Sequence, residues 1–338
     1  MIKYFNSHNF KKNPFFDAIK SGYFYNPCIQ GKMNVAIFLS GIGSNFKRLL
    51  KYQRELKNQL GEKTPFEIGV VVSDTKNGYF NAKSIISEIT GSPKSIPTIL
   101  LESKKVVPKK FLSTTDKKIL EEGRLIYDKI TAKKLEPYKI NFGILAGYKR
   151  LVSPWFIKRI ACINVHPAPL NIVDPFSGER SFTGNNAVKK QILAGCKFLQ
   201  STVHIVRKGA DTGEILMLSE KTPVELEGMT LKTLELNPKI LKKIVDSNQK
   251  KLKLVGDFKI FPKVILLSAL GKYRFDKFGK ISLNLNSNSC KPEDIKYSEF
   301  KNILKQLLIK NNNSLFLDLF KHKNIEKEVI KCVELQQF

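Results

Sequence analysis

The sequence predicts an α/β protein whose mainly parallel, Rossmann-like open sheet carries helices on both faces. Two observations support this fold class. Short apolar runs of strand length alternate with longer stretches in which apolar residues recur at helical spacing. The first run also ends in a glycine turn that leads directly into a helical stretch. Parallel strands need crossover connections, and helical crossovers cover both faces of the sheet.

The first apolar run, at residues 34–39, predicts a buried strand that ends in the segment Ser-Gly-Ile-Gly-Ser-Asn at 40–45. Apolar side chains then recur from Phe46 to Leu60 at roughly helical spacing, which predicts a helix after the turn. Further buried strands are expected at 68–73, 140–146 and 162–165.

Residues 201–206 alternate in polarity, which predicts another strand. The remaining expected elements are a strand at 214–219, helices at 231–251 and 257–270, and a hairpin at 273–285. Pro238 should interrupt the start of the first of these helices. From about residue 290 the chain is rich in lysine and predicts a basic helical extension.

The composition supports a folded protein with a strong positive charge. The chain has 338 residues, of which 42% are hydrophobic, and this is enough for one large domain or two ordinary ones. A net charge of +28 predicts either a polyanionic partner such as nucleic acid or a general bias toward lysine. Basic residues spread along the whole chain favour the second explanation, so a nucleic-acid partner is not expected.

The cellular compartment and the metal content are predicted from sequence features that the chain lacks. It has no run of about 18 apolar residues and no secretion signal, so neither a membrane span nor export is expected. Its five cysteines are scattered, without a CxxC pair: Cys28, Cys162, Cys196, Cys290 and Cys332. This pattern predicts reduced thiols in a cytoplasmic protein and no metal site.

The segment from Gly41 to Asn45 is the first candidate site. A glycine turn between a strand and a helix can direct backbone N–H groups at a phosphate, aided by the positive end of the helix. Ser44 and Asn45 would add side-chain donors. A plain helix cap at Ser44 or Asn45 explains the same residues equally well. The segment matches neither the dinucleotide fingerprint nor a Walker loop.

Asn164 and His166 form the second candidate site. Because they are two residues apart on an expected strand, their side chains point to the same side. They also lie at the carboxyl end of that strand, where open α/β sheets bind ligands. An amide and an imidazole there can polarise a carbonyl and stabilise a developing oxyanion. The alternative is a structural histidine satisfied within a loop.

Asp211 stands in Gly-Ala-Asp-Thr-Gly and is the third candidate. If it lies against His166, it would raise the affinity of that ring for a proton and fix its orientation. An aspartate between two glycines is also a common turn. His204, on the preceding strand, either lines the same pocket or packs in the core.

At this point the chain resembles the glycinamide ribonucleotide formyltransferase family, over about residues 33–275. The resemblance rests on four segments in the right order, namely 40–45, 145–154, 163–167 and 202–213. It implies transfer of a formyl group from 10-formyltetrahydrofolate to the amine of glycinamide ribonucleotide, without a metal. It also implies an extension at 1–32, a catalytic domain at 33–285 with a phosphate-binding half (33–145) and a folate-binding, catalytic half (146–285), and an extension at 286–338.

The resemblance assigns a role to each matched residue. The catalytic set is Asn164, His166 and Asp211. The substrate phosphate would be held by Gly43, Ser44, Asn45 and Arg124. Folate would lie against Arg150, Leu151 and Val152. Asp257 falls where the family has a glutamate that binds the substrate amine. The shorter Asp257 and an unusual loop at 173–186 depart from the family pattern, and these departures concern the acceptor rather than the reaction.

Several alternatives stay open from the sequence. A sister enzyme could act on methionyl-tRNA or an amino-sugar nucleotide, and a formyltetrahydrofolate deformylase would use water as the acceptor. A basic nucleic-acid-binding protein with an inactive transferase fold is the alternative from another class. The expected partners are a small phosphorylated amine and a folate, with the protein a monomer or homodimer.

Overall fold

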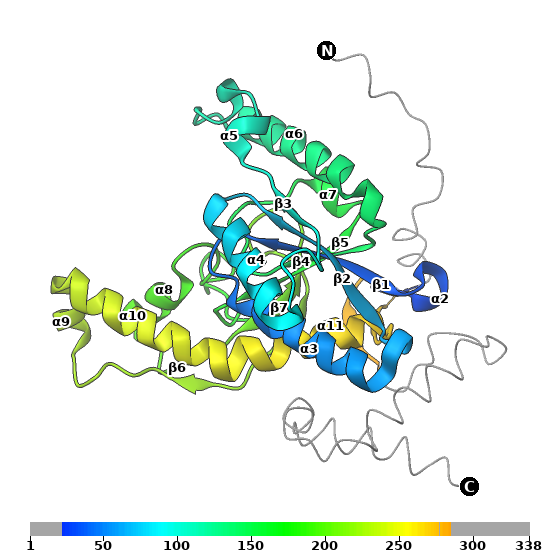
Figure 1. Ribbon diagram of the computed structural model, residues 1–338. Coiled ribbons are helices and arrows are strands. Elements are labelled where there is room, and N and C mark those ends of the chain that lie inside the picture. Colours follow the sequence, from blue (N-terminus) through cyan, green and yellow to red (C-terminus); the bar gives the residue numbers. More distant parts are fainter. Residues whose placement is uncertain (1–21, 277, 285–338) are drawn as a thin grey trace, which may run out of the picture.

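The computed structural model describes residues 22–276 and 278–284. Within them, a seven-stranded sheet forms the centre of the molecule (Figure 1). The strands are β1 (Met33–Leu39), β2 (Phe66–Ser73), β3 (Thr98–Leu100), β4 (Phe142–Leu145), β5 (Ala161–His166), β6 (Phe198–Leu199), β7 (Thr202–Ile205), β8 (Ile215–Leu218), β9 (Thr222–Pro223), β10 (Tyr273–Phe275) and β11 (Ile281–Leu283). The α-helices are α2 (Pro27–Gln30), α3 (Ser44–Leu60), α4 (Lys76–Thr90), α5 (Ser103–Val106), α6 (Lys117–Leu135), α7 (Pro154–Ile157), α8 (Ala187–Leu193), α9 (Leu231–Leu236), α10 (Pro238–Leu252) and α11 (Phe258–Ala269). Short 3-10 helices, η1 (Gly61–Lys63), η2 (Lys109–Phe111) and η3 (Glu136–Tyr138), and a π-helix, η4 (Lys253–Asp257), complete the set.

The strand order, β3-β2-β1-β4-β5-β7-β8, confirms the predicted mainly parallel sheet. β1 pairs in parallel with β2 and β4, and the pairs β2–β3 and β4–β5 are also parallel. β7 and β8 add an antiparallel edge. The chain moves outward from β1 to β3 and then returns to place β4 on the other side of β1. This reversal creates a switch point at the carboxyl ends of β1 and β4, the place where such sheets bind ligands.

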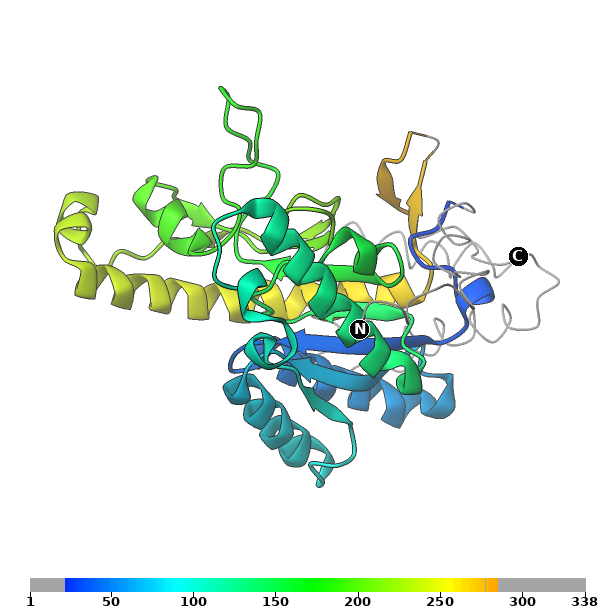
Figure 2. The ribbon, with the colours of Figure 1, turned by 90° about the horizontal axis from the view of Figure 1, so that it is seen from above.

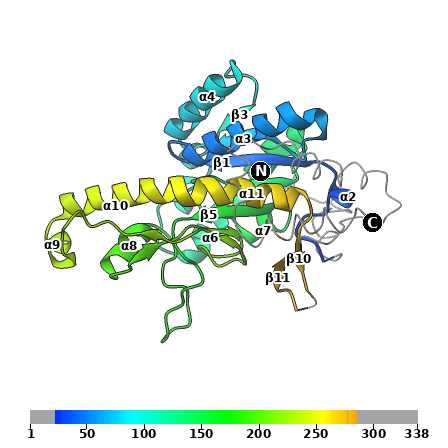
Figure 3. The ribbon, with the colours of Figure 1, turned by 90° about the horizontal axis from the view of Figure 1, so that it is seen from below.

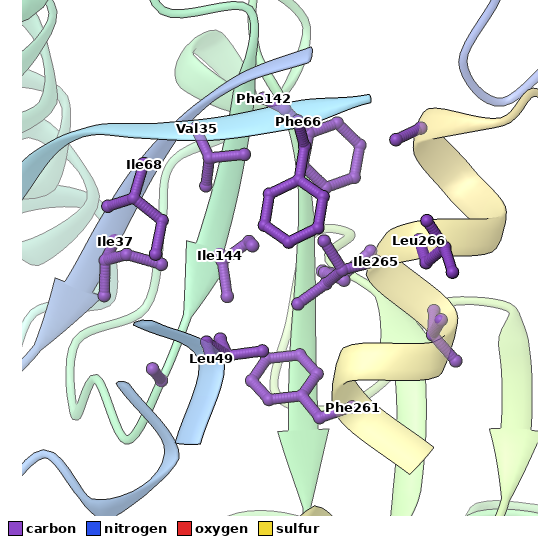
Figure 4. Packing of buried hydrophobic residues seen from close by; sticks show 14 of the residues in the cluster. Val35, Ile37, Leu49, Phe66, Ile68, Phe142, Ile144, Phe261, Ile265 and Leu266 are labelled. Carbon is purple, nitrogen blue, oxygen red and sulfur yellow. The ribbon is translucent and has the colours of Figure 1, made fainter. Parts of the chain in front are cut away.

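Both faces of the sheet are covered, as predicted. Val35, Ile37 and Leu39 of β1 belong to one hydrophobic cluster, which includes residues of α3, α4 and α11. Ala36 and Phe38, which alternate with them, belong to a second cluster with residues of α6 and α7. Alternate side chains of a strand point to opposite faces, so burial of both sets requires helices on both sides. Figure 4 shows strand side chains of the first cluster against α11.

Residues before the first strand of the sheet join this core. Phe24 and Tyr25 are fully buried. Both rings meet the ring of Phe142 edge-on, at centroid distances of 5.6 and 6.0 Å. The segment at 22–32 was expected to belong to an extension, and its aromatic residues nevertheless fill the end of the main cluster. The predicted helical extension at 286–338, like residues 1–21, lies outside the described residues.

A long helical rod forms one side of the molecule. Pro238 begins α10 directly after α9, as its effect on the helix predicted, and η4 joins α10 to α11. Figure 3 shows the rod running from α9 at one end of the molecule to the sheet. Its outer part packs with α8 and α9 in a hydrophobic cluster of its own, separate from the main core. Its inner part, α11, lies in the main core. The predicted hairpin is confirmed by the antiparallel pair β10–β11.

The helices and the cysteine thiols of the structure bear on what the composition predicted. Among the described residues, no helix is both long and apolar enough to cross a membrane. Cys162 and Cys196 are free thiols, as expected.

Candidate active site

An open cavity of about 930 Å³ lies at the carboxyl ends of β1, β4 and β5. The switch point of the sheet therefore holds a pocket. Its lining includes these predicted site residues: Gly43, Ser44, Asn45, Arg150, Leu151, Val152, Asn164, His166, His204, Asp211 and Asp257. Arg124 is not among the lining residues. Segments far apart in the sequence thus converge on one cavity.

His166 and Asp211 form the centre of the site. Nδ1 of His166 lies 3.3 Å from Oδ2 of Asp211, and both side chains are nearly buried. Nε2 of the same ring donates a hydrogen bond to the carbonyl oxygen of Phe182 at 2.7 Å. Both ring nitrogens therefore face hydrogen-bond acceptors. A neutral imidazole has one N–H and satisfies only one of them, whereas the imidazolium satisfies both.

Burial opposes the positive charge of the protonated His166 ring. Desolvation lowers the pKa of His166, while Asp211 and the carbonyl of Phe182 act in the opposite direction, and burial prevails. The ring of the unliganded protein thus releases its proton more readily than an ordinary histidine. A ring that readily exchanges a proton beside a fixed carboxylate is suited to move one during a reaction.

Asp211 is held as a carboxylate by several donors. Burial acts to raise its pKa, but His204, His166 and the backbone amide of Gly184 outweigh burial and bring the value to about 2. The Gly184 amide donates to Oδ2 at 2.7 Å. Nε2 of His204 lies 3.3 Å from Oδ1, and Nδ2 of Asn164 lies 3.4 Å from the same oxygen. The residue is therefore an ionised, well-anchored partner for both histidines.

The backbone around Asp211 is locally strained. Asp211 has φ +55°, in the left-handed region that few residues other than glycine adopt. Gly213 approaches β7 so closely that a Cβ atom there would lie 1.8 Å from the carbonyl oxygen of Ile205. The glycines of this loop thus permit the backbone path that brings the carboxylate to the ring of His166.

Asn164 and His204 face each other across the pair β5–β7. Their register partners them directly, and Nδ2 of Asn164 lies 3.2 Å from Nε2 of His204. Nδ1 of His204 donates to the carbonyl oxygen of Ile205 at 2.8 Å, which leaves Nε2 turned toward the site. His204 lines the cavity and contacts the carboxylate of Asp211, and its side chain is nearly buried. The two alternatives for this residue, pocket lining and core packing, are therefore compatible.

The glycine turn presents an uncapped helix start. Gly43, with φ +72°, is the N-cap of α3, and among the described residues no side chain caps that helix start. The alternative in which Ser44 or Asn45 caps the helix is therefore wrong. The first N–H groups of α3 stand beside the cavity, where they can bind an anion. Nζ of Lys253 lies 3.4 Å from Oγ of Ser44 and adds positive charge there.

Asp257 is buried where the π-helix meets α11. Oδ1 accepts from Oγ of Ser201 at 2.5 Å, and Oδ2 accepts from Nδ2 of Asn45 at 3.1 Å. Burial raises the pKa of this carboxyl group, against the effect of its two donors and of Lys253. Oδ1 of Asn45, also buried, has no hydrogen-bond partner among the described residues. Asp257 and Asn45 together thus offer acceptor oxygens beside the start of α3.

Another part of the cavity wall carries a stacked arginine. The guanidinium of Arg150 lies over the ring of Tyr127, 3.9 Å from its centroid. It stands beside Leu151 and Val152, which supply apolar surface to the cavity. Such a wall suits a flat aromatic ligand with polar edges.

Sequence reasoning missed three parts of the site. The Phe182 carbonyl and the Gly184 amide belong to the backbone, and no residue type announces such a role. Lys253 gave a weak signal, because it lies four residues before Asp257 in a helical stretch and such residues share one helix face.

Comparison with known proteins points to one family. The sequence pattern of a family described as Formyl transferase matches residues 33–244. The trifunctional purine biosynthetic proteins adenosine-3 of Bos taurus and Homo sapiens are each 27% identical over 253 residues, which is 74% of this chain. The chain spans about one fifth of the length of these relatives, 20% in both cases.

Two solved structures share the fold. Glycinamide ribonucleotide transformylase 1 from Symbiobacterium toebii has a TM-score of 0.51 at 22% identity, over 75% of this chain and 94% of that one. A formyltetrahydrofolate deformylase from Pseudomonas syringae pv. tomato has a TM-score of 0.50 at 16% identity, over 75% of this chain and 66% of that one.

Proposed function

Because the chain belongs to the formyl transferase family, we propose that it transfers a formyl group from 10-formyltetrahydrofolate to the amine of glycinamide ribonucleotide, in purine biosynthesis. The observation that carries this proposal is the His166–Asp211 contact of 3.3 Å within a cavity that an uncapped helix start also borders. The adenosine-3 relatives, named as purine biosynthetic proteins, support the choice of acceptor. The proposed catalytic unit is residues 33–285.

The proposed reaction moves one carbon between two nitrogens. The neutral amine attacks the formyl carbon, a new C–N bond forms, and the bond from that carbon to N10 of the folate breaks. One proton leaves the amine and one reaches N10, so the proton count balances without an external acid.

His166 and Asn164 stabilise the negative charge that develops on the formyl oxygen. Asp211 favours the imidazolium and, as the anchored base of the site, helps to pass the proton from the amine toward N10. Burial lowers the pKa of His166, which makes the ring a ready proton donor, while the negative charge that develops on the formyl oxygen favours the protonated ring. These roles need no covalent link between the chain and the formyl group.

The remaining residues bind the two substrates in this proposal. Gly43, Ser44 and Asn45 hold the phosphate of the acceptor at the start of α3, with Arg124 as a further phosphate ligand. Asp257 binds the acceptor amine. Arg150, Leu151 and Val152 form the part of the cavity wall that holds the folate.

The test is an assay with 10-formyltetrahydrofolate and a panel of amine acceptors that follows release of the deformylated folate. The expected result is release that depends on glycinamide ribonucleotide and is lost in Asp211→Asn. Release that is equal without any acceptor would instead identify a hydrolase. Preference for methionyl-tRNA or an amino-sugar nucleotide would replace the acceptor but keep the reaction class.

A further inference from the structure

The loop between β5 and α8 carries a projecting hairpin next to the active site. Val173 and Arg180 form an antiparallel bridge at its base. The amide of Asp174 donates to the carbonyl oxygen of Glu179 at 2.7 Å inside it. Figures 2 and 3 show this hairpin as a green finger that leaves the body of the molecule. We refer to residues 172–181 as the finger.

The chain that descends from the finger contacts both members of the His166–Asp211 pair. A guanidinium nitrogen of Arg180 donates to the backbone carbonyl oxygen of Asp211. Two residues later, the carbonyl of Phe182 accepts from His166, and two residues after that, the amide of Gly184 donates to the carboxylate of Asp211. Phe182 and Gly184 act through backbone groups. Arg180 is the member of this series whose side chain makes the contact, and it can therefore be altered by substitution.

The loop that carries Asp211 is closed at its base but strained near its tip. Arg207 and Glu214 join its two ends through two hydrogen bonds, Nε to Oε2 at 2.8 Å and Nη2 to Oε1 at 2.9 Å. Between them, Asp211 has φ +55°, a conformation that costs about 1 kcal/mol or more for a residue with a Cβ atom. A bond to the carbonyl of Asp211 itself is the contact best placed to hold that conformation.

We propose that Arg180 is a positioning residue, which fixes the backbone of Asp211 so that its carboxylate stays against His166. The effect of Arg180 on turnover rests on the proposed function, but its effect on the His166–Asp211 contact does not. The finger thereby becomes part of the active site framework, although its tip lies far from the chemistry.

A simpler role for Arg180 is to add positive charge, and the two roles predict opposite effects on His166. If Arg180 acts only through its charge, its removal raises the affinity of His166 for a proton. If it positions Asp211, its removal lets the carboxylate drift away, and the affinity of His166 for a proton falls. The other titratable groups that act on His166, namely His204 and Asp257, are the same in both cases, so the two roles differ only in where Asp211 lies.

The experiment is an NMR pH titration of the intact chain labelled with ¹⁵N-histidine. The chain has four histidines, and the variants His166→Gln and His204→Gln assign the two in the site. In Arg180→Met, the titration midpoint of His166 should fall by about half a unit relative to the wild type, because an anion within reach of a histidine shifts its pKa by about one unit or more. A midpoint that rises or stays in place overturns the proposal.

Two controls separate positioning from general damage. Arg159→Met removes another guanidinium that donates to a backbone carbonyl, that of Trp155 at 2.8 Å, remote from the cavity, and should leave the His166 midpoint unchanged. Arg180→Lys keeps the positive charge on a shorter side chain, so its His166 midpoint should lie between those of Arg180→Met and the wild type. In the Asp211→Asn background, Arg180→Met should no longer lower the midpoint, because the carboxylate that it positions is absent.

Turnover provides the second readout. Arg180→Met should lower kcat about tenfold with KM for the acceptor unchanged, because the substrate contacts remain while the catalytic pair loses its alignment. If the wild-type chain shows no formyl transfer to any acceptor, the proposed function fails, whereas the NMR result still decides the role of Arg180.

Discussion

Nδ1 of His166 lies 3.3 Å from Oδ2 of Asp211, although the two residues come from different strands and loops. This contact satisfies the spatial condition on which the catalytic hypothesis depended. The ring also donates to the Phe182 carbonyl, so its position is fixed from both sides. A ring held in this way can stabilise charge without first having to reorient.

Replacement of either partner should abolish most of the activity. His166→Ala and Asp211→Asn are each expected to lower kcat by about 10²–10⁴-fold, because general acid–base catalysis contributes about that much. Thermal unfolding should show that both variants remain folded. Asp246→Asn, which removes a carboxylate from the cavity wall on α10, serves as the control and should keep kcat within about threefold. Near-normal single-turnover rates in both catalytic variants would contradict the assignment.

Asp211 should also make the stability of the protein depend on pH. Its folded pKa of about 2 lies below its ordinary value of about 3.9, so the carboxylate stabilises the fold fully above about pH 4 and this stabilisation is lost as pH falls toward 2. The stabilisation amounts to about 2 kcal/mol. The stability difference between the wild type and Asp211→Asn, measured by urea unfolding, should therefore shrink as the pH falls from about 5 to about 2. A constant difference over that range would show that the carboxylate is not depressed.

Two variants can separate the structural role of Asp257 from its proposed role of binding the acceptor amine. Ser201→Ala removes the Oγ donor to Oδ1 and should destabilise the fold by about 1–2 kcal/mol, while the acceptor KM changes little, since Ser201 does not line the cavity. Asp257→Asn removes the charge that would bind the amine and should raise that KM about tenfold. Equal effects of both variants on KM would mean that Asp257 acts only through the packing of the helix.

Two basic residues test the position of the acceptor phosphate. Lys253→Ala should raise KM for a phosphorylated acceptor about tenfold, because Nζ lies beside Ser44 at the start of α3. Arg124→Ala is also predicted to raise KM more than it lowers kcat. Lys133→Ala, an exposed position on α6, provides the charge-matched control. An unchanged KM in Arg124→Ala, given its place outside the cavity lining, would remove that residue from the phosphate site.

Gly213 should tolerate no side chain. In Gly213→Ala, the new methyl group would lie 1.8 Å from the carbonyl oxygen of Ile205, so β7 and the Asp211 loop must separate. We expect a loss of about 3 kcal/mol in the free energy of unfolding, at the upper end for a single substitution. Gly41→Ala, where a Cβ atom meets nothing within 4 Å and φ is not positive, should change stability by less than about 1 kcal/mol. Similar stabilities for the two variants would contradict the close approach.

The sequence predicted the parts of the fold that follow from local patterns. Apolar runs located β1, β2, β4, β5, β7 and β8, and a glycine turn located the start of α3, because both reflect burial and backbone freedom close in sequence. The strands β3, β6 and β9 have only two or three residues each and were not predicted, because so short a segment shows no pattern. The burial of Phe24 and Tyr25 was not predicted, because a short segment without periodicity gives no sign that it packs against an aromatic ring distant in the sequence. The bond from His166 to the Phe182 carbonyl escaped it too, because any residue can supply a backbone oxygen.

The π-helix at 253–257 takes up about one extra residue between the two halves of the rod that it joins. On one side of it Lys242 and Gln249 face the cavity, and on the other Phe261 lies in the core. Deleting one residue within it would restore regular α-helical winding, because a turn of π-helix holds about one residue more than a turn of α-helix, and would leave the outer half facing the same way. A change of one residue in length would thus alter the placement of Lys253 and Asp257, which lie in the π-helix and line the cavity, while the rest of that wall stayed in place.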